Sequence, residues 1–431
     1  MNGLWALVPL VLYIVLCFCP FGQIFAVIAG IIVAAVMGGH GLMDVAAGIR
    51  AGMGSFLGYI GLIILLGGGL GMVLKRTGVV NCLVAWITGK MKVDSQRKAF
   101  LLVMICSVLI VSVLGTMAGG NAILAPVLIP IAASVGVVPN AMAVLLHGAG
   151  ATGLFLGPFT PPVVALMEFT GVSYPQYLLN AGIPISLIMW IVTFFWAGRV
   201  QKKYAGVTCY AEQAEEAALD LANYRPDGRT KLATATFFVV LIGLVVWGIS
   251  IGGGSTFVLG LMLVTAALTG LAGRLKVKEI IDAVCDGARP LVWLFFFFVL
   301  LDPFINFISD AGAFQALAGV LAPYVEKSGH VAFVAFTTLV GIFGVPGAAV
   351  AQAEVLNKMF LELAQAQGIP MVLWAAVLLV GSQMTSFAMP EGDMQGQMGL
   401  ARSDDLKSVL CNGWLICLFT TLYVVVRAFF I

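Results

Sequence analysis

Apolar residues along this chain gather into runs of about 17 to 25 residues, which polar and basic stretches separate. A run of that length crosses the hydrocarbon core of a bilayer as a helix. The pattern predicts helices at about residues 4–19, 23–37, 56–74, 177–197, 232–251, 257–272, 291–309 and 409–426. The sequence therefore indicates an all-α polytopic membrane protein.

Small and polar residues interrupt the apolar pattern at two places in each half of the chain. We expect re-entrant hairpins at 99–136 and 330–368, and broken helices at 140–167 and 370–393. The hairpin tips lie at 115–121 and 344–348. Inside a bilayer, free backbone amides are tolerated only where protein covers them or where they line a cavity. Secondary transporters build their binding sites from such breaks.

The order of segments in residues 1–200 recurs in residues 231–431, with the polar segment 201–230 between them. Each half has about five spanning helices, one re-entrant hairpin and one interrupted helix. This recurrence predicts two inverted repeats. The weakly amphipathic segment 41–55 is expected at a membrane interface, the segment 277–289 is also amphipathic, and the three glycines at 67–69 permit close helix packing.

The charge pattern fixes an expected orientation. Only 10% of the 431 residues are charged, 61% are hydrophobic and the mean hydropathy is +1.07, whereas soluble domains carry about 25% charged residues. If both hairpins are re-entrant, most of the 22 Lys and Arg residues fall on one face, which predicts a cytoplasmic 201–230 segment and both termini outside. The net charge of +2 is scattered over loops and does not indicate nucleic-acid binding.

The sequence holds no common catalytic motif. The eight cysteines lie mostly inside apolar runs, and no metal-spaced Cys/His pattern, HExxH, GxSxG or phosphate loop is present. We therefore expect no enzyme activity, no bound metal and no cofactor beyond a coupling ion, H⁺ or Na⁺.

Ionisable side chains inside apolar segments are costly unless they are paired or hydrated, so each one is a functional candidate. The candidates for proton or cation coupling are His147, Asp302, Glu354, Glu391 and Asp393. Glu354 follows the second tip and is the strongest single candidate. His147 has an alternative role as a hydrogen-bonding core residue, Asp302 as an interfacial cap, and the other three as solvent-facing acids.

Polar and small residues at the four breaks form the predicted binding set. The substrate-binding candidates are Thr116, Gly119, Gly120, Asn121, Thr152, Thr160, Ser382, Gln383, Thr385 and Ser386. Their alternative role is the capping of broken helix ends. The two roles are compatible, because freed amides at helix N-termini attract anions.

Three stretches carry a resemblance to a known group of transporters: GTMAGGNAILAPVLIPIAASVGV from residue 115, GLFLGPFTPPV from residue 153 and GSQMTSFAMPEGDMQGQMGLARSDDLK from residue 381. The chain resembles the ion transporter superfamily, and within it the gluconate and C4-dicarboxylate permeases and related sodium/proton antiporters. Of the Ser-Asn-Thr motif that dicarboxylate members carry at hairpin tips, Asn121 alone is present. The resemblance implies a homodimer in the bacterial inner membrane and an elevator-type motion.

Two functions lead on the sequence, and a carrier of neutral or zwitterionic solutes such as amino acids is a further alternative. The first is a proton- or sodium-coupled carrier of a small organic anion, which the amide-rich breaks favour. The second is a sodium/proton antiporter that uses Glu354, Glu391 and Asp393, which their acidic chemistry favours. A channel is disfavoured, since channels use continuous pore-lining helices.

Overall fold

The computed structural model describes residues 4–17, 19, 22–210, 225–251, 253–344 and 349–431. The first half contains η1 (Leu4–Leu7), α1 (Val8–Cys17), α2 (Gln23–Gly38), α3 (Leu42–Gly52), α4 (Phe56–Arg76), α5 (Val79–Met91), α6 (Gln96–Leu114), α7 (Met117–Ser134), α8 (Pro139–Leu156), α9 (Pro161–Thr170), α10 (Tyr174–Tyr177), η2 (Leu178–Gly182) and α11 (Ile183–Tyr204). The second half contains α13 (Gly228–Ser250), α14 (Gly254–Ala272), α15 (Val277–Ala288), η3 (Arg289–Leu291), α16 (Val292–Asp310), α17 (Ala313–Ile342), α18 (Ala349–Ala366), α19 (Met371–Gln383), α20 (Thr385–Ala388), α21 (Gly392–Leu400) and α22 (Leu406–Ala428).

The predicted fold class is confirmed, because every element in the described ranges is helical. Eight of these helices are long and apolar enough to cross a membrane, or nine if the bent pair α8 and α9 counts as one span. The protein is a multi-pass α-helical membrane protein. The predicted second tip at residues 345–348 and the linker core at 211–224 lie outside the described residues.

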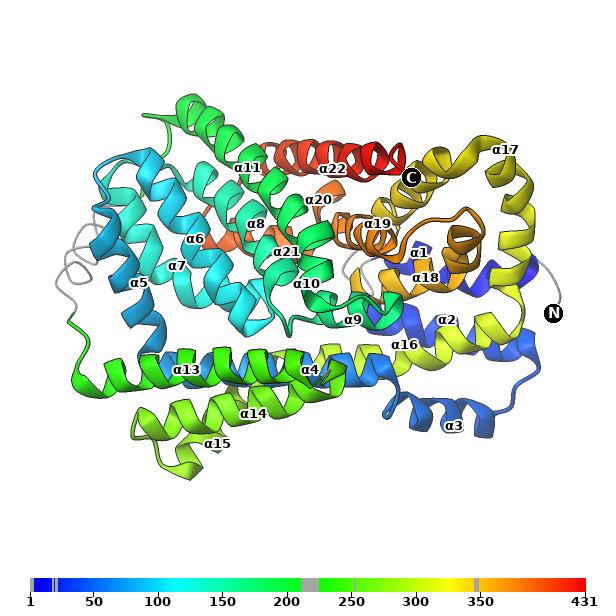
Figure 1. The fold of residues 1–431 in the computed structure, drawn as a ribbon, viewed down its shortest axis with the longest axis horizontal. Coiled ribbons are helices and arrows are strands. Elements are labelled where there is room, and N and C mark those ends of the chain that lie inside the picture. Colours follow the sequence, from blue (N-terminus) through cyan, green and yellow to red (C-terminus); the bar gives the residue numbers. More distant parts are fainter. Residues whose placement is uncertain (1–3, 18, 20–21, 211–224, 252, 345–348) are drawn as a thin grey trace.

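Helix α4 lies at the centre of one layer and packs on α14, α15 and α16. Figure 1 shows α4, α13, α14 and α15 along one long edge of the molecule, with α22 along the opposite edge and α11 running from that edge toward the middle. The hairpin α6–α7, the pair α8–α9 and helices α19 to α21 lie between these edges. The broken segments are therefore enclosed by continuous helices, as the backbone rule for membrane interiors requires.

The three adjacent glycines of α4 explain how closely α15 approaches it. A Cβ atom on Gly287 of α15 would lie 2.1 Å from the Gly68 carbonyl oxygen, and one on Gly68 would lie 2.5 Å from the Gly287 carbonyl oxygen. Only glycine at both positions permits this backbone contact. The predicted close packing of the glycine cluster is thus present, and the amphipathic segment 277–289 lies against a spanning helix.

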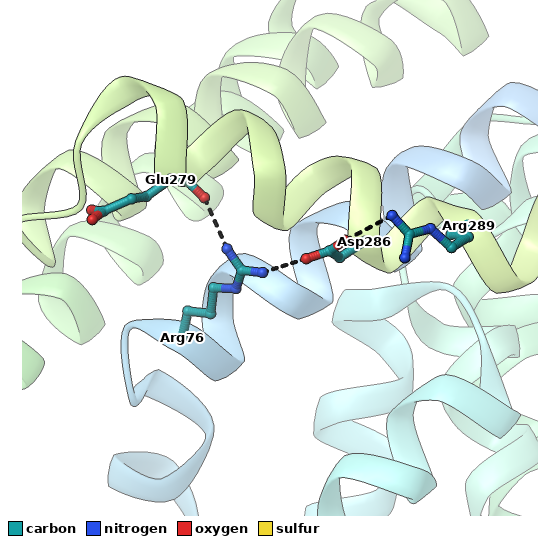
Figure 2. Close-up of polar contacts among 4 residues, drawn as sticks. All are labelled: Arg76, Glu279, Asp286 and Arg289. Carbon is teal, nitrogen blue, oxygen red and sulfur yellow. Dashed lines mark hydrogen bonds and ion pairs between the residues drawn. The ribbon is translucent and has the colours of Figure 1, made fainter.

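An ion-pair cluster beside Gly287 also holds α15 on α4 (Figure 2). The Arg76 guanidinium donates to the Asp286 carboxylate at 2.5 Å and to the Glu279 carbonyl oxygen at 3.2 Å. Arg289 contacts the second Asp286 oxygen at 3.3 Å. The side chains of Arg76 and Asp286 are each about one-third exposed. Water screens such an ion pair, so the cluster contributes little to stability and mainly orients α15.

Helix pairs in the two halves correspond in order. Helix α1 packs on α2, and in the second half α13 packs on α14. Helix α3 packs on α16, and α15 packs on α4. Helix α6 packs on both α7 and α8, and α17 packs on both α18 and α19. The chain turns sharply at Gly115 between α6 and α7, with φ 65°, and within α17 at Gly329, with φ 74°. The two inverted repeats themselves stay a prediction.

Candidate functional site

A small cavity lies where broken segments of both halves meet. Its volume is about 70 Å³. Its lining residues are Met117, Ala151, Leu154, Phe155, Ala349, Gln383, Ser386, Glu391 and Asp393. Four of the residues predicted from sequence, Gln383, Ser386, Glu391 and Asp393, therefore share one space.

Helix starts converge on this cavity. Helix α7 begins at Met117, α18 begins at Ala349, and α21 begins just after Glu391, its N-cap residue. The first residues of a helix have amides without an intrahelical partner, and its dipole is positive at that end. Glu391 and Asp393 at the start of α21 are favoured there, because the helix dipole stabilises their negative charge.

Oxygen atoms dominate the polar lining. The Ser386 hydroxyl donates to the Gln383 carbonyl oxygen at 2.8 Å, and the Gln383 side-chain amide donates to the Ser382 hydroxyl at 3.3 Å. Carboxylate, amide and hydroxyl oxygens are the donors that hard cations prefer. In the described residues no group of three or more His, Cys, Asp or Glu side chains forms a metal cluster, so any ion here draws on amide and hydroxyl oxygens as well.

Asn121 lies behind the cavity and connects the two halves. Its side-chain amide donates to the Gln397 side-chain oxygen at 2.7 Å and to the Leu146 carbonyl oxygen at 3.0 Å. Its own oxygen accepts from the Ser107 hydroxyl. Asn121 is fully buried, and both of its donor hydrogens are used within the protein. These contacts give Asn121 a structural role beside the predicted binding role.

His147 is fully buried in α8, and its ring lies 4.4 Å from the ring centre of Phe387. Neither ring nitrogen has a hydrogen-bond partner of good geometry among the described side and main chains. Phe387 directly follows Ser386 of the cavity lining. His147 is thus one residue layer removed from the cavity, and its predicted coupling role stays a prediction.

Glu354 and Asp302, predicted from separate segments, belong to one polar network. A Glu354 carboxylate oxygen contacts the Lys358 ammonium at 2.9 Å, and Lys358 also donates to the Asn306 side-chain oxygen at 3.3 Å. The Asn306 amide in turn donates to Asp302 at 3.1 Å. The network joins α18 to α16 and does not line the cavity, so the structure separates these two acids from Glu391 and Asp393.

The remaining predicted residues have contacts within the protein. The Thr116 hydroxyl caps α7 at the Gly119 amide, Thr160 donates to the Leu154 and Gly157 carbonyl oxygens, and Thr152 donates to Ala149 and accepts from Trp190. Thr385 donates to the Gly341 and Ser382 carbonyl oxygens. Gly120 packs against Val111, where a Cβ would clash at 2.8 Å. Both roles expected for this set, capping and binding, remain compatible with these contacts.

Sequence reasoning missed several residues of this region. Gln397 was outside the predicted broken helix, and Met117 and Ala349 are apolar. Lys358 carried a usable signal, because an acid and a lysine four residues apart on a helix lie on one face. Gln397 carried no such signal in the sequence, because its partner Asn121 lies 276 residues away.

Comparisons with known proteins place this arrangement among transporters. The model of the Na⁺/H⁺ antiporter family matches residues 13–198. The structure is similar to that of MtrF from Neisseria gonorrhoeae, with 17% identity and a TM-score of 0.60, over 90% of this chain and 84% of MtrF. It is also similar to the YdaH transporter from Alcanivorax borkumensis, with 16% identity and a TM-score of 0.58, over 88% of this chain and 87% of YdaH.

The protein has the fold of a membrane transporter. The predicted resemblance to sodium/proton antiporters is confirmed in sequence over residues 13–198, and the likeness of fold extends over both halves. The MtrF structure is described as illuminating a class of antimetabolite efflux pumps, and the YdaH structure as having an unusual topology. No protein of curated function matches the chain. The matching family and both solved structures are transporters and not enzymes.

Proposed function

We propose that this protein exchanges protons for sodium ions across the cytoplasmic membrane, with the cation bound by Glu391 and Asp393. The observation that carries the proposal is the cavity at which both acids meet Gln383, Ser386 and the starts of α7 and α18. The match to the Na⁺/H⁺ antiporter family supports it.

The size and charge of the cavity favour an ion. At about 70 Å³ it is several times smaller than the roughly 300–1,000 Å³ of pockets that hold drug-sized ligands. Two carboxylates in so small a space repel an anion unless a cation or proton neutralises them. The cavity has room for a sodium ion with about one or two waters, each of about 30 Å³, and its oxygen donors suit that ion.

Exchange follows from competition at these carboxylates. Each binds a proton or helps to bind sodium, so a rise in proton concentration on one side displaces sodium there. Broken helices of opposing halves hold such sites near the middle of the membrane, and motion of one unit against the other exposes the site to each side in turn. An elevator-type motion of the hairpin α6–α7 and the helices around it is part of the proposal.

A second candidate is a proton- or sodium-coupled carrier of a small organic anion. The specific observation in its favour is that α7 and α18 begin at the cavity, because helix starts attract anions. The fold of MtrF, described as an antimetabolite efflux pump, adds to it. In this function the acids bind the coupling ion and the organic anion binds next to them, in a conformation with a larger cavity.

The location and assembly proposed from the sequence complete this picture. The protein lies in the inner membrane as a homodimer, the segment 201–230 is cytoplasmic and both termini are outside. The basic residues near the C-terminal end of α11, Arg199, Lys202 and Lys203, support this orientation.

The experiment uses proteoliposomes that contain a pH dye. Sodium added without any organic solute should change the internal pH in the wild type. Asp393→Asn and Glu391→Gln should each lower the rate at least about tenfold, which corresponds to about 1.4 kcal/mol of lost binding or barrier energy. Asp404→Asn, an exposed acid in the loop after α21, is the matched control and should leave the rate unchanged.

Two results would overturn sodium/proton exchange. One is a pH response that appears only when gluconate-like or dicarboxylate anions are added, which would establish the second candidate. The other is an unchanged sodium response in the Asp393→Asn and Glu391→Gln variants, which would place the cation elsewhere.

A further inference from the structure

A large apolar groove lies between α11 and α22, away from the proposed cation site. Its volume is about 720 Å³. Its lining residues are Ile188, Ile191, Val192, Phe195, Trp196, Arg199, Leu415, Phe419, Leu422, Tyr423, Val426 and Arg427. In Figure 1, α22 lies along the edge of the molecule opposite α15, and α11 runs from that edge toward the middle of the view. The lining side chains of Ile191, Phe195 and Leu422 are each more than half exposed, so the groove opens on the outside of the protein, where lipid surrounds a membrane protein.

Hydrogen bonds at both ends hold the two helices in a fixed antiparallel arrangement. The Trp196 indole donates to the Ser408 carbonyl oxygen at 2.8 Å at one end. At the other end, the Tyr423 hydroxyl and the Arg427 guanidinium both donate to the Asn180 carbonyl oxygen, at 2.8 and 3.0 Å. The groove is thus preformed, and a ligand need not order it.

The α11 side of the groove has the length of one lipid leaflet. From Ile188 to Arg199 the helix rises by about 17 Å, at ~1.5 Å per residue. Half of a bilayer's hydrocarbon core is about 15 Å thick. An acyl chain that starts beside Arg199 therefore reaches the middle of the membrane at the level of Ile188.

The Arg199 end of the groove is positively charged. Arg199, Lys202 and Lys203 have the spacing that brings side chains to one helix face, and all three are exposed. The exposed Lys407 begins the neighbouring end of α22, while Asp405 there caps the Ser408 amide at 3.1 Å. The described contact of the Arg199 guanidinium is with the face of Trp196, at 6.0 Å from the ring centre. The opposite end differs, because Arg427 is hydrogen-bonded to the protein.

We propose that this groove binds an anionic phospholipid, with its phosphate on Arg199 and Lys202 and an acyl chain along α11. Basic pockets between transmembrane helices on the cytoplasmic side are suited to anionic headgroups. Arg199 presents a planar fork of donors that matches a phosphate. The Trp196 ring, fixed by its bond to Ser408, closes the apolar part of the groove below the headgroup.

Charge argues against a second copy of the chain in this groove. Two copies in the same membrane orientation are related by an axis along the membrane normal, so equal levels of both chains face each other. Arg199, Lys202 and Lys203 would then meet the same cations of the partner. Anionic lipid removes that repulsion, whereas a protein partner of this sequence adds to it.

The test measures thermal unfolding of the full-length protein in detergent during titration with phosphatidylglycerol or phosphatidylcholine. A ligand that binds the folded state raises the midpoint in proportion to the logarithm of its concentration. Wild type should respond to phosphatidylglycerol at lower concentration than to phosphatidylcholine. Arg199→Gln should weaken the phosphatidylglycerol response about fivefold, as loss of one basic contact predicts. Arg97→Gln, an exposed arginine at the start of α6, should keep the full response.

A second variant tests the acyl-chain part separately. Val192→Trp fills the groove and should weaken the response to both lipids. Equal responses of the wild type to the two lipids, or an undiminished preference in Arg199→Gln, would overturn the proposal. So would conversion of a dimer to a monomer by Val192→Trp with no change in lipid response, since the groove would then be a protein interface.

Discussion

Asn121 and Gln397 lie 276 residues apart and share a hydrogen bond of 2.7 Å. Asn121 belongs to the first helical turns of α7, and Gln397 belongs to α21, the helix that starts with the two acids of the proposed cation site. Both side chains are fully buried. Any shift of α7 relative to α21 must break this bond, so it couples the position of the first hairpin to the cavity.

Asn121→Ala should lower the free energy of unfolding by about 1–3 kcal/mol, because the buried Gln397 and Leu146 oxygens lose their donors. Thermal or denaturant unfolding in detergent measures the change. Gln365→Ala, an exposed amide on α18, is the control and should change stability by less than about 0.5 kcal/mol. In the double variant with Gln397→Ala, the effects should not add, and strict additivity would show that the bond contributes nothing.

The Asn121 substitution also tests the predicted binding role. We expect Asn121→Ala to raise the substrate concentration at half-maximal transport. If the variant is measurably less stable but reaches half-maximal transport at the same substrate concentration as the wild type, Asn121 has only its structural role.

Glu354 lies apart from the proposed cation site, so we expect it to act in coupling by carrying a proton, and Glu354→Gln should then abolish ion-driven transport. That variant alone leaves the Lys358 ammonium without its carboxylate partner, which destabilises the protein for an unrelated reason. The informative variant is therefore Glu354→Gln with Lys358→Gln, which removes both charges. It should unfold near the wild-type temperature and show no coupled transport in proteoliposomes, and wild-type rates in it would exclude Glu354 from coupling.

Gly287→Ala should destabilise the protein by about 1–3 kcal/mol, since its Cβ would lie 2.1 Å from the Gly68 carbonyl oxygen and would force α15 away from α4. The control is Gly243→Ala in α13, where no atom lies within 4 Å of the added Cβ. That change should stabilise the helix by up to about 1 kcal/mol. Equal effects of the two substitutions on the unfolding temperature would contradict the close contact between α4 and α15.

Asp286→Asn should have a much smaller effect than the change at its neighbour Gly287. The Arg76–Asp286 pair is about one-third exposed, and pairs of this kind contribute about 0–1 kcal/mol. Raising the salt concentration should reduce the difference between wild type and variant further. A loss above about 2 kcal/mol, measured by unfolding at low salt, would show that the cluster in Figure 2 is a principal anchor of α15.

The sequence by itself determined most of the helical segments, although the boundaries of some differ, as where α17 begins at Ala313 and not at the predicted residue 330. The predicted span at 56–74 is α4 at Phe56–Arg76, and the predicted hairpin segment 99–136 forms α6 and α7, from Gln96 to Ser134. Each of these two helices is long enough to cross a membrane, so the re-entrant path stays a prediction. The helix predictions succeed because a bilayer imposes one length and one polarity on every spanning segment. The four breaks were also visible, since glycine, proline and polar residues interrupt apolar runs locally.

Only the tertiary structure decided which predicted residues share a site. It brought Glu391 and Asp393 to Met117 and Ala349, and it assigned Glu354 to a network with Asp302 through Lys358 and Asn306. The structure also placed the amphipathic α15 on α4. The sequence could not predict this, because the contact joins the backbones of Gly68 and Gly287, which lie in opposite halves of the chain. Hydrophobic pattern is a property of neighbouring residues, whereas these contacts join residues hundreds of positions apart and are fixed by packing.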